Sequence, residues 1–155
     1  MTPETTLEAA PTTTTAPAAP RAPKKPSGGY WWGTGRRKTS VARVRVKPGA
    51  GKYRVNGRSI DEFFTEIQYR NEVTAPLKTT ELFGKMDVFI RVHGGGTTGQ
   101  SGACCVGLAR ALAGYDPALE KALRDNGYLT IDSRQVERKK PGQPGARRRF
   151  QFSKR

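Results

Sequence analysis

Regular alternation between aliphatic and cationic residues is the feature that most limits how this chain can fold. Over residues 42–47 three aliphatic side chains alternate with three cationic ones, and a similar pattern returns over residues 53–56, after the turn at residues 48–51. Successive side chains of a strand point to opposite faces of a sheet, so one face is expected to be apolar and the other cationic. The pattern predicts a hairpin over residues 37–56 that packs one face on a core.

The residues after the hairpin predict an α+β body. Ser59 and Glu62 have the spacing of a capping box, which marks the start of a helix. Gly84 and Gly127 are placed where glycines end helices. The expected elements are a helix at 60–68, a helix from 76 to 83, a strand at 86–92, a helix that follows the loop 94–102, a helix at 117–126 and a short strand at 128–131. Together they predict a single mixed-sheet domain with helices on one side.

Composition divides the chain into three parts. Residues 1–29 are low-complexity Thr, Ala and Pro, which predicts a disordered extension. Residues 30–133 form the globular α+β domain, and residues 134–155 form an extended basic tail. The domain opens on an aromatic cluster at residues 30–32. We expect these rings to anchor the core, and stacking on nucleic-acid bases is the alternative.

Positive charge is strong and segregated. The chain carries a formal net charge of +15 and has a sequence pI of about 10.4. Residues 36–58 hold nine cations and no anion, whereas residues 59–133 hold seven cations and ten anions. A cationic sheet face without counter-charges repels itself in water, and phosphate is the natural counter-charge. This distribution favours a directed nucleic-acid-binding face over a membrane or an acidic protein.

The tail predicts a second contact with a polyanion. Residues 134–155 hold nine cations against one anion, Glu137, and their few apolar residues follow no helical or strand period. Pro141 and Pro144 forbid a continuous helix. Such a segment cannot bury enough apolar surface to order itself in water, but fully extended it could reach roughly 70 Å. Its aromatic residues Phe150 and Phe152 could stack on bases or pack between sugars.

Several other classes of protein are disfavoured. No apolar run approaches the ~20 residues of a membrane span. Cys104 and Cys105 are adjacent and are the only cysteines, which is typical of a reduced cytoplasmic protein and lacks zinc spacing. His93 is the only histidine, so no metal site, cofactor or Cys–His nucleophile is expected.

The glycine-rich loop is the sharpest enzyme-like signal. Gly94, Gly99 and Ser101 fit a nucleotide-phosphate loop, but Gln100 stands where that motif requires lysine. Without the lysine charge, phosphoryl transfer is disfavoured and no small-molecule substrate is expected. Glycines at a helix N-terminus still expose backbone N–H groups, which can bind a phosphate of an RNA backbone.

Four stretches resemble one family. They are GTGRRKTSVARVRVKPGAG, with VNGRSIDEFF just beyond it; FIRVHGGGTTGQSGA; IDSRQVERKK; and the terminal QFSKR. In this order and spacing they resemble the bacterial form of the ninth small-subunit ribosomal protein, over about residues 33–155. The resemblance implies a fold of the ribosomal-protein and kinase domain-two type, with a left-handed βαβ crossover. It also implies a non-catalytic constituent of the small ribosomal subunit in the cytoplasm.

The resemblance implies the partners. The body is expected to bind 16S ribosomal RNA in the subunit head, next to other head proteins. The tail is expected to pass through RNA and to reach the anticodon stem-loop of the peptidyl-site transfer RNA with Ser153, Lys154 and Arg155. The chain departs from the family pattern at residues 141–145, where relatives carry an aromatic residue, glycine and lysines, so fewer phosphate contacts are expected there.

The residues expected to contact ribosomal RNA fall into three groups. The hairpin and the residue before it supply cations for phosphate oxygens: Arg36, Arg37, Lys38, Arg43, Arg45 and Lys47. The glycine-rich loop supplies main-chain donors from Gly94, Gly95, Gly96, Thr97 and Thr98. The tail supplies Arg138, Lys139, Lys140, Arg147, Arg148 and Arg149. A free-standing RNA chaperone and, less favoured, a phosphate-binding enzyme are the alternatives to a ribosomal role.

Overall fold

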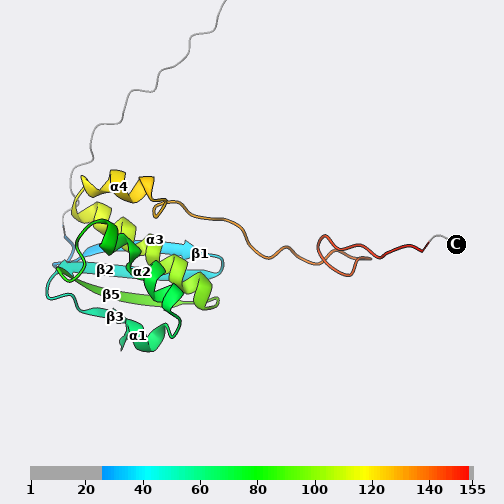
Figure 1. The fold of residues 1–155 in the computed structure, drawn as a ribbon, viewed down its shortest axis with the longest axis horizontal. Helices are drawn as coiled ribbons and strands as arrows, with labels where there is room; N and C mark the ends of the chain where they lie inside the picture. Colours follow the sequence, from blue (N-terminus) through cyan, green and yellow to red (C-terminus); the bar gives the residue numbers. More distant parts are fainter. Residues whose placement is uncertain (1–25, 154–155) are drawn as a thin grey trace, which may run out of the picture.

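A mixed five-stranded sheet lies at the centre of the computed structural model, which describes residues 26–153 (Figure 1). Its strands lie in the spatial order β1-β2-β5-β3-β4. The elements along the chain are β1 (Trp31–Arg37), β2 (Ser40–Pro48), β3 (Tyr53–Val55), β4 (Arg58–Ser59), α1 (Ile60–Phe63), α2 (Ile67–Thr79), β5 (Met86–His93), α3 (Thr97–Tyr115) and α4 (Leu119–Asp125). The α+β class and the single mixed sheet are confirmed.

The predicted hairpin over residues 37–56 is wrong in its pairing. The hairpin that forms joins β1 to β2, through a turn in which Lys38 has a φ of 52°. β5 separates β2 from β3, pairing antiparallel with β2 and parallel with β3. Alternation identifies the buried face of a strand but not its neighbours. The chain reaches β5 only after crossing through α1 and α2, and β5 then fills the place between β2 and β3.

The predicted alternation of faces is confirmed. Ala42, Val44 and Val46 are fully buried on the helix-covered face, and Val55 on β3 joins them. Met86, Val88, Ile90 and Val92 complete this side of the sheet. α3 packs across β1 and β2 and contributes its small and aliphatic residues to the same core.

Four element predictions need correction. The loop expected at 94–102 ends at Gly96, because α3 already begins at Thr97. The helix expected at 60–68 is split into α1 and α2, and Pro76 lies inside α2 rather than at the start of a helix. Pro76 is buried, so tertiary packing outweighs its low helix propensity. No strand forms at 128–131, where the backbone bonds close the end of α4. Tyr128 donates to the carbonyl of Leu123, and Gly127 adopts a φ of 76°, which is a Schellman ending.

Two remaining predictions concern the start of the chain and the membrane. Most of the extension predicted for residues 1–29 lies outside the described residues, but Ser27 exchanges two backbone hydrogen bonds with Tyr30. In the part of the chain that the structure describes, no helix has the length and apolar character needed to span a membrane.

The contact of β1 with α3 depends on glycine. A Cβ added to Gly35 would lie 2.0 Å from the carbonyl oxygen of Ala103, and one added to Gly33 would lie 2.1 Å from that of Gly107. Gly107 meets the strand in return, because its Cβ would lie 2.8 Å from Val44 Cγ2. The two backbones therefore approach more closely than any side chain allows, and β1 lies directly on the helix.

We expect Gly35→Ala to destabilise the fold by about 3 kcal/mol, since the new methyl group meets helix backbone that cannot move independently. Urea denaturation followed by circular dichroism measures the loss. Gly145→Ala is the matched control, because a Cβ there makes only an ordinary contact of 3.4 Å with Arg148 Cβ. Equal stability of Gly35→Ala and Gly145→Ala would contradict the proposed role of close backbone packing.

Candidate nucleic-acid interface

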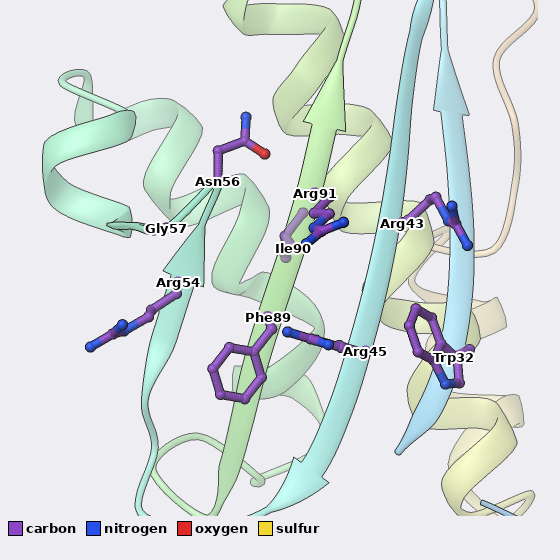
Figure 2. A pocket seen from close by; sticks show the side chains of 9 residues that line it. All are labelled: Trp32, Arg43, Arg45, Arg54, Asn56, Gly57, Phe89, Ile90 and Arg91. Atoms are coloured by element: carbon purple, nitrogen blue, oxygen red, sulfur yellow. The ribbon is translucent and has the colours of Figure 1, made fainter. Parts of the chain in front are cut away.

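The sheet face opposite the helices carries cationic and aromatic side chains in rows. Trp32 on β1, Arg45 on β2 and Phe89 on β5 are cross-strand partners in one register. Arg54 on β3 continues the same row beside Phe89. Figure 2 shows this row on neighbouring strands, with Arg45 reaching toward Phe89. We call this surface, formed by the outward residues of β1, β2, β5 and β3, the open face.

A second row of the open face places like charges together. Arg43 on β2 lies directly opposite Arg91 on β5. Directly opposed like charges destabilise a pair of strands. Both side chains are exposed, and neither has a carboxylate partner among the residues that the structure describes. The open face therefore lacks an internal counter-charge at this point, which an anionic ligand would supply.

Arg45 and Lys47 contact aromatic rings. The guanidinium carbon of Arg45 lies 5.2 Å from the ring centroids of both Tyr30 and Phe89. Lys47 Nζ lies 5.7 Å from the Tyr30 centroid and 3.8 Å from Asp87 Oδ2. Of the cations predicted on β2, Lys47 is thus partly neutralised, whereas Arg45 keeps its charge and its N–H donors.

The open face is hollowed near its centre. A cavity of about 700 Å³ is lined by four arginines and no acidic residue. Trp32 lies at its edge with 45% of its surface exposed, so the prediction that it anchors the core is wrong. Trp31 lies on the helix side, where its ring and the Tyr115 ring are nearly perpendicular and their centroids are 4.8 Å apart. These two tryptophans are neighbours in one strand, and successive side chains of a strand point to opposite faces of the sheet.

The same rule separates Arg36 from Arg37. Arg36 is exposed on the open face, whereas Arg37 lies on the helix side, at the place where the tail leaves the body. Arg37 donates hydrogen bonds from Nη1 to the carbonyl oxygens of Asp132 at 2.9 Å and Arg134 at 3.2 Å. Its Nη2 also lies 3.0 Å from Asp132 Oδ2. The Arg37 guanidinium thus holds the first residues of the tail, and its contact with RNA stays a prediction.

Asp132 is shared between Arg37 and Arg134. Arg134 donates to both carboxylate oxygens of Asp132, and the hydrogen bonds from Arg134 are the main cause that lowers the pKa of Asp132 to about 2. The charge of Arg37 acts in the same direction. The carboxylate is therefore ionised at any ordinary pH and keeps the junction between body and tail closed.

The glycine-rich loop lies against the β1–β2 turn. Gly94 and Gly95 have φ values of 77° and 62°, which favour glycine, and a Cβ on Gly94 would lie 2.5 Å from the carbonyl oxygen of Thr39. Ser40 Oγ donates to the Gly94 carbonyl at 2.9 Å. The loop leads into α3, whose N-cap Gly96 offers no side-chain acceptor to the first N–H groups of the helix. The fold therefore brings Lys38 and the loop residues to the same end of the sheet.

The loop lacks the chemistry of a nucleotide-hydrolysing site. Gln100, at the position of the missing lysine, donates from Nε2 to the Gly94 carbonyl at 3.1 Å and so closes the loop on itself. Ser101 is buried and donates to Glu72 Oε2 at 2.6 Å, so its hydroxyl is not available to a metal ion. Among the described residues no group of His, Cys, Asp and Glu could hold a metal.

The two cysteines are packing residues. Cys104 and Cys105 are buried on α3 and are not joined to each other. Burial raises the pKa of each thiol to about 12, so both are protonated at neutral pH. A reactive thiolate is therefore excluded at this position.

The tail runs away from the body and contains no helix or strand over residues 134–153 (Figure 1). Its anion Glu137 accepts hydrogen bonds from Arg147, whose Nε lies 3.1 Å from both carboxylate oxygens. This pair closes the proline- and glycine-rich stretch into a loop. Arg138, Lys139, Lys140, Arg148 and Arg149 are exposed. Ser153 is exposed, and Lys154 and Arg155 lie outside the described residues.

Sequence reasoning missed Arg54 and Arg91 as interface candidates. Arg91 lies in a strand that was recognised for its buried residues, and extending the alternation to its other face would have found it. The position of Arg54 beside Phe89 could not be found in this way, because it depends on the parallel pairing of β3 with β5.

Comparison with known proteins agrees with this geometry. A family model described as Ribosomal protein S9/S16 matches residues 35–155. The chain belongs to this family. It is 57% identical over 123 residues to the small ribosomal subunit protein uS9 of Rhodopirellula baltica, covering 79% of this chain and 90% of the relative. It is 50% identical over 121 residues to uS9 of Anaeromyxobacter sp. strain K, covering 78% and 93%.

A relative from a plant extends the range. The small ribosomal subunit protein uS9m of Arabidopsis thaliana is 48% identical over 127 residues, which is 82% of this chain and 30% of that protein. Family membership makes the chain a structural, non-enzymatic constituent of the small ribosomal subunit, with ribosomal RNA and other ribosomal proteins as partners. The resemblance predicted from the four sequence stretches is confirmed.

We expect Arg37→Gln to loosen the root of the tail, because the variant loses the ion pair with Asp132 and its two carbonyl bonds. Amide hydrogen exchange over residues 128–136 of the free protein should accelerate. Arg36→Gln is the matched control, since the neighbouring side chain lies on the other face of the sheet. Faster exchange in both variants, or in neither, would show that Arg37 does not hold the tail.

Proposed function

We propose that the open face and the glycine-rich loop bind 16S ribosomal RNA in the head of the small subunit, in the cytoplasm. The observation that carries this proposal is the opposition of Arg43 and Arg91, neither of which has a carboxylate partner in the described part of the chain. Phosphate oxygens supply the missing negative charge, and arginine presents a planar fork of donors that fits them. Because the helices cover the other face of the sheet, the open face is the one that remains accessible to RNA.

The glycine-rich loop adds a second kind of phosphate contact. Its backbone lies against the β1–β2 turn, so the N–H groups at the start of α3 and Lys38 lie at the same end of the sheet. Backbone donors at a helix N-terminus bind phosphate without reading sequence. The body would thereby be positioned on the RNA by contacts with phosphates, made by Lys38 and by the main-chain N–H groups of the loop.

The tail would carry the second part of the function. Its exposed cations Arg138, Lys139, Lys140, Arg148 and Arg149 would contact phosphates along the way. Arg147 would do so only after exchanging its partner Glu137 for a phosphate. We propose that Ser153, Lys154 and Arg155 then reach the anticodon stem-loop of the peptidyl-site transfer RNA. The body would also contact neighbouring head proteins.

The contact of the open face with RNA can be measured through its salt dependence. Arg43→Gln and Arg91→Gln should each weaken binding to 16S ribosomal RNA and reduce the slope of log K against log salt by about one. Filter binding across a salt series gives both values. Lys121→Gln, which removes an exposed cation on α4, should change neither. Unchanged slopes in the two arginine variants would exclude the open face from the RNA contact.

The role of the tail end is tested on assembled subunits. Small subunits that carry a chain ending at Phe152 should assemble normally but bind peptidyl-site transfer RNA more weakly, with a shallower salt slope, because one or two phosphate contacts are lost. Filter binding of the transfer RNA compares them with subunits that carry the full chain. If affinity and slope are unchanged, the tail contacts ribosomal RNA alone and the transfer-RNA role is wrong.

A further inference from the structure

The open face carries aromatic rings, which phosphate binding does not require. A surface that contacts only phosphates needs cations, yet the hollow of about 700 Å³ also contains the rings of Trp32 and Phe89. Both belong to one cross-strand row, with Arg45 between them. Aromatic rings beside a cationic groove are the arrangement by which proteins bind single-stranded nucleic acid, because every base has a face that stacks.

The Trp32 ring is held in place rather than loosely exposed. Its indole Nε1–H donates to the carbonyl oxygen of Ser27 at 3.3 Å. The segment at residues 27–30 is in turn closed by two backbone hydrogen bonds between Ser27 and Tyr30. The ring thus keeps a fixed orientation at the edge of the hollow. A pre-oriented ring loses little conformational entropy when a flat ligand stacks on it.

The ligand is expected to carry both a flat ring and negative charge. Phe89 is half-buried beneath Arg45 and next to Tyr30, and these contacts hold its ring in place. Figure 2 shows Arg54 pointing away from this row on the side of β3, while Arg43 extends toward β1. Cations therefore lie at two places around the aromatic row: Arg54 at its β3 end, and Arg43 two residues from Arg45 along β2.

We propose that Trp32, Arg45 and Phe89 bind an unpaired base of single-stranded RNA. Arg43, Arg54 and Arg91 bind the phosphates on either side of that base. The inference rests on the proposed function of the open face and adds that the bound RNA is unpaired at this site. Recognition of unstacked bases on aromatic and guanidinium planes is a usual mode of RNA binding, whereas a regular duplex hides its bases.

Fluorescence of Trp32 tests the proposal on the full chain and separates this site from the basic tail. The chain has two tryptophans, so Trp31→Phe leaves Trp32 as the only indole. The probes are a short oligouridylate and a ribose-phosphate polymer of the same length without bases. We expect the oligouridylate to quench Trp32 and to bind this site about tenfold more tightly than the abasic polymer.

Two variants in the Trp31→Phe background sharpen the test. Phe89→Leu keeps an apolar side chain in the sheet and should weaken oligouridylate binding about tenfold, while leaving the affinity for the abasic polymer unchanged. Phe83→Leu is the matched control, because Phe83 is an exposed aromatic residue outside the open face, and it should change neither affinity. Circular dichroism verifies that both variants fold.

The outcomes distinguish this inference from the function on which it rests. Equal quenching by both polymers, or no quenching while Arg43→Gln still reduces the salt slope, would overturn base stacking and leave phosphate binding in place. Loss of any effect of Arg43→Gln would overturn both. Quenching of Trp32 by oligoglutamate as strong as by oligouridylate would assign the open face to an acidic protein segment. If removal of residues 1–25 from the free protein changes the emission of Trp32, the occupant of the open face is the chain's own N-terminal extension rather than RNA.

Discussion

The contact between β1 and α3 is the constraint on which the rest of the structure depends. Gly33 and Gly35 bring the strand backbone against the helix, and Gly107 allows the same approach from the helix side. No side chain larger than hydrogen fits at these places. Helices cover one face of the sheet closely, and alternation places Arg36 of β1, Arg43 and Arg45 of β2 and Arg91 of β5 on the other face, whereas Arg37 at the end of β1 lies on the helix side. Burial of the apolar face against the helices thus leaves the cationic face exposed.

The arginines of the open face have no carboxylate partners in the described part of the chain. Arg43 and Arg91 are opposed across two strands, and the guanidinium of Arg45 lies over the rings of Tyr30 and Phe89. A surface of this kind costs some stability in the free protein and recovers it when an anion binds. For a constituent of the small ribosomal subunit this is a reasonable arrangement, since the working state of the protein is the RNA-bound one.

The junction between body and tail gives the tail a defined start. Arg37 reaches from β1 to Asp132 and Arg134, so a residue near the beginning of the domain holds the segment that follows its last helix. The tail then leaves the body from this point (Figure 1). Two neighbouring arginines, Arg36 and Arg37, therefore serve different purposes, one on the open face and one at the root of the tail.

The loop at residues 94–96 and the first turn of α3 keep the residue pattern of a phosphate-binding motif but not its chemistry. Its glycines and the helix that follows resemble a nucleotide-phosphate loop, but Gln100 closes the loop and Ser101 is bound to Glu72. What remains is a turn of exposed backbone near a lysine. Such a turn suits the phosphate of a polymer, which requires position and charge but no reaction.

The amino-acid sequence by itself determined the α+β class, the buried faces of β2 and β5, the segregation of charge and the family. These follow from local periodicity, composition and motif order, which need no knowledge of neighbours in space. Only the tertiary structure decided that β5 lies between β2 and β3, that Arg54 lies beside Phe89, and that Arg37 binds Asp132. Strand order and long-range ion pairs arise from the packing of distant segments, and no local pattern encodes them.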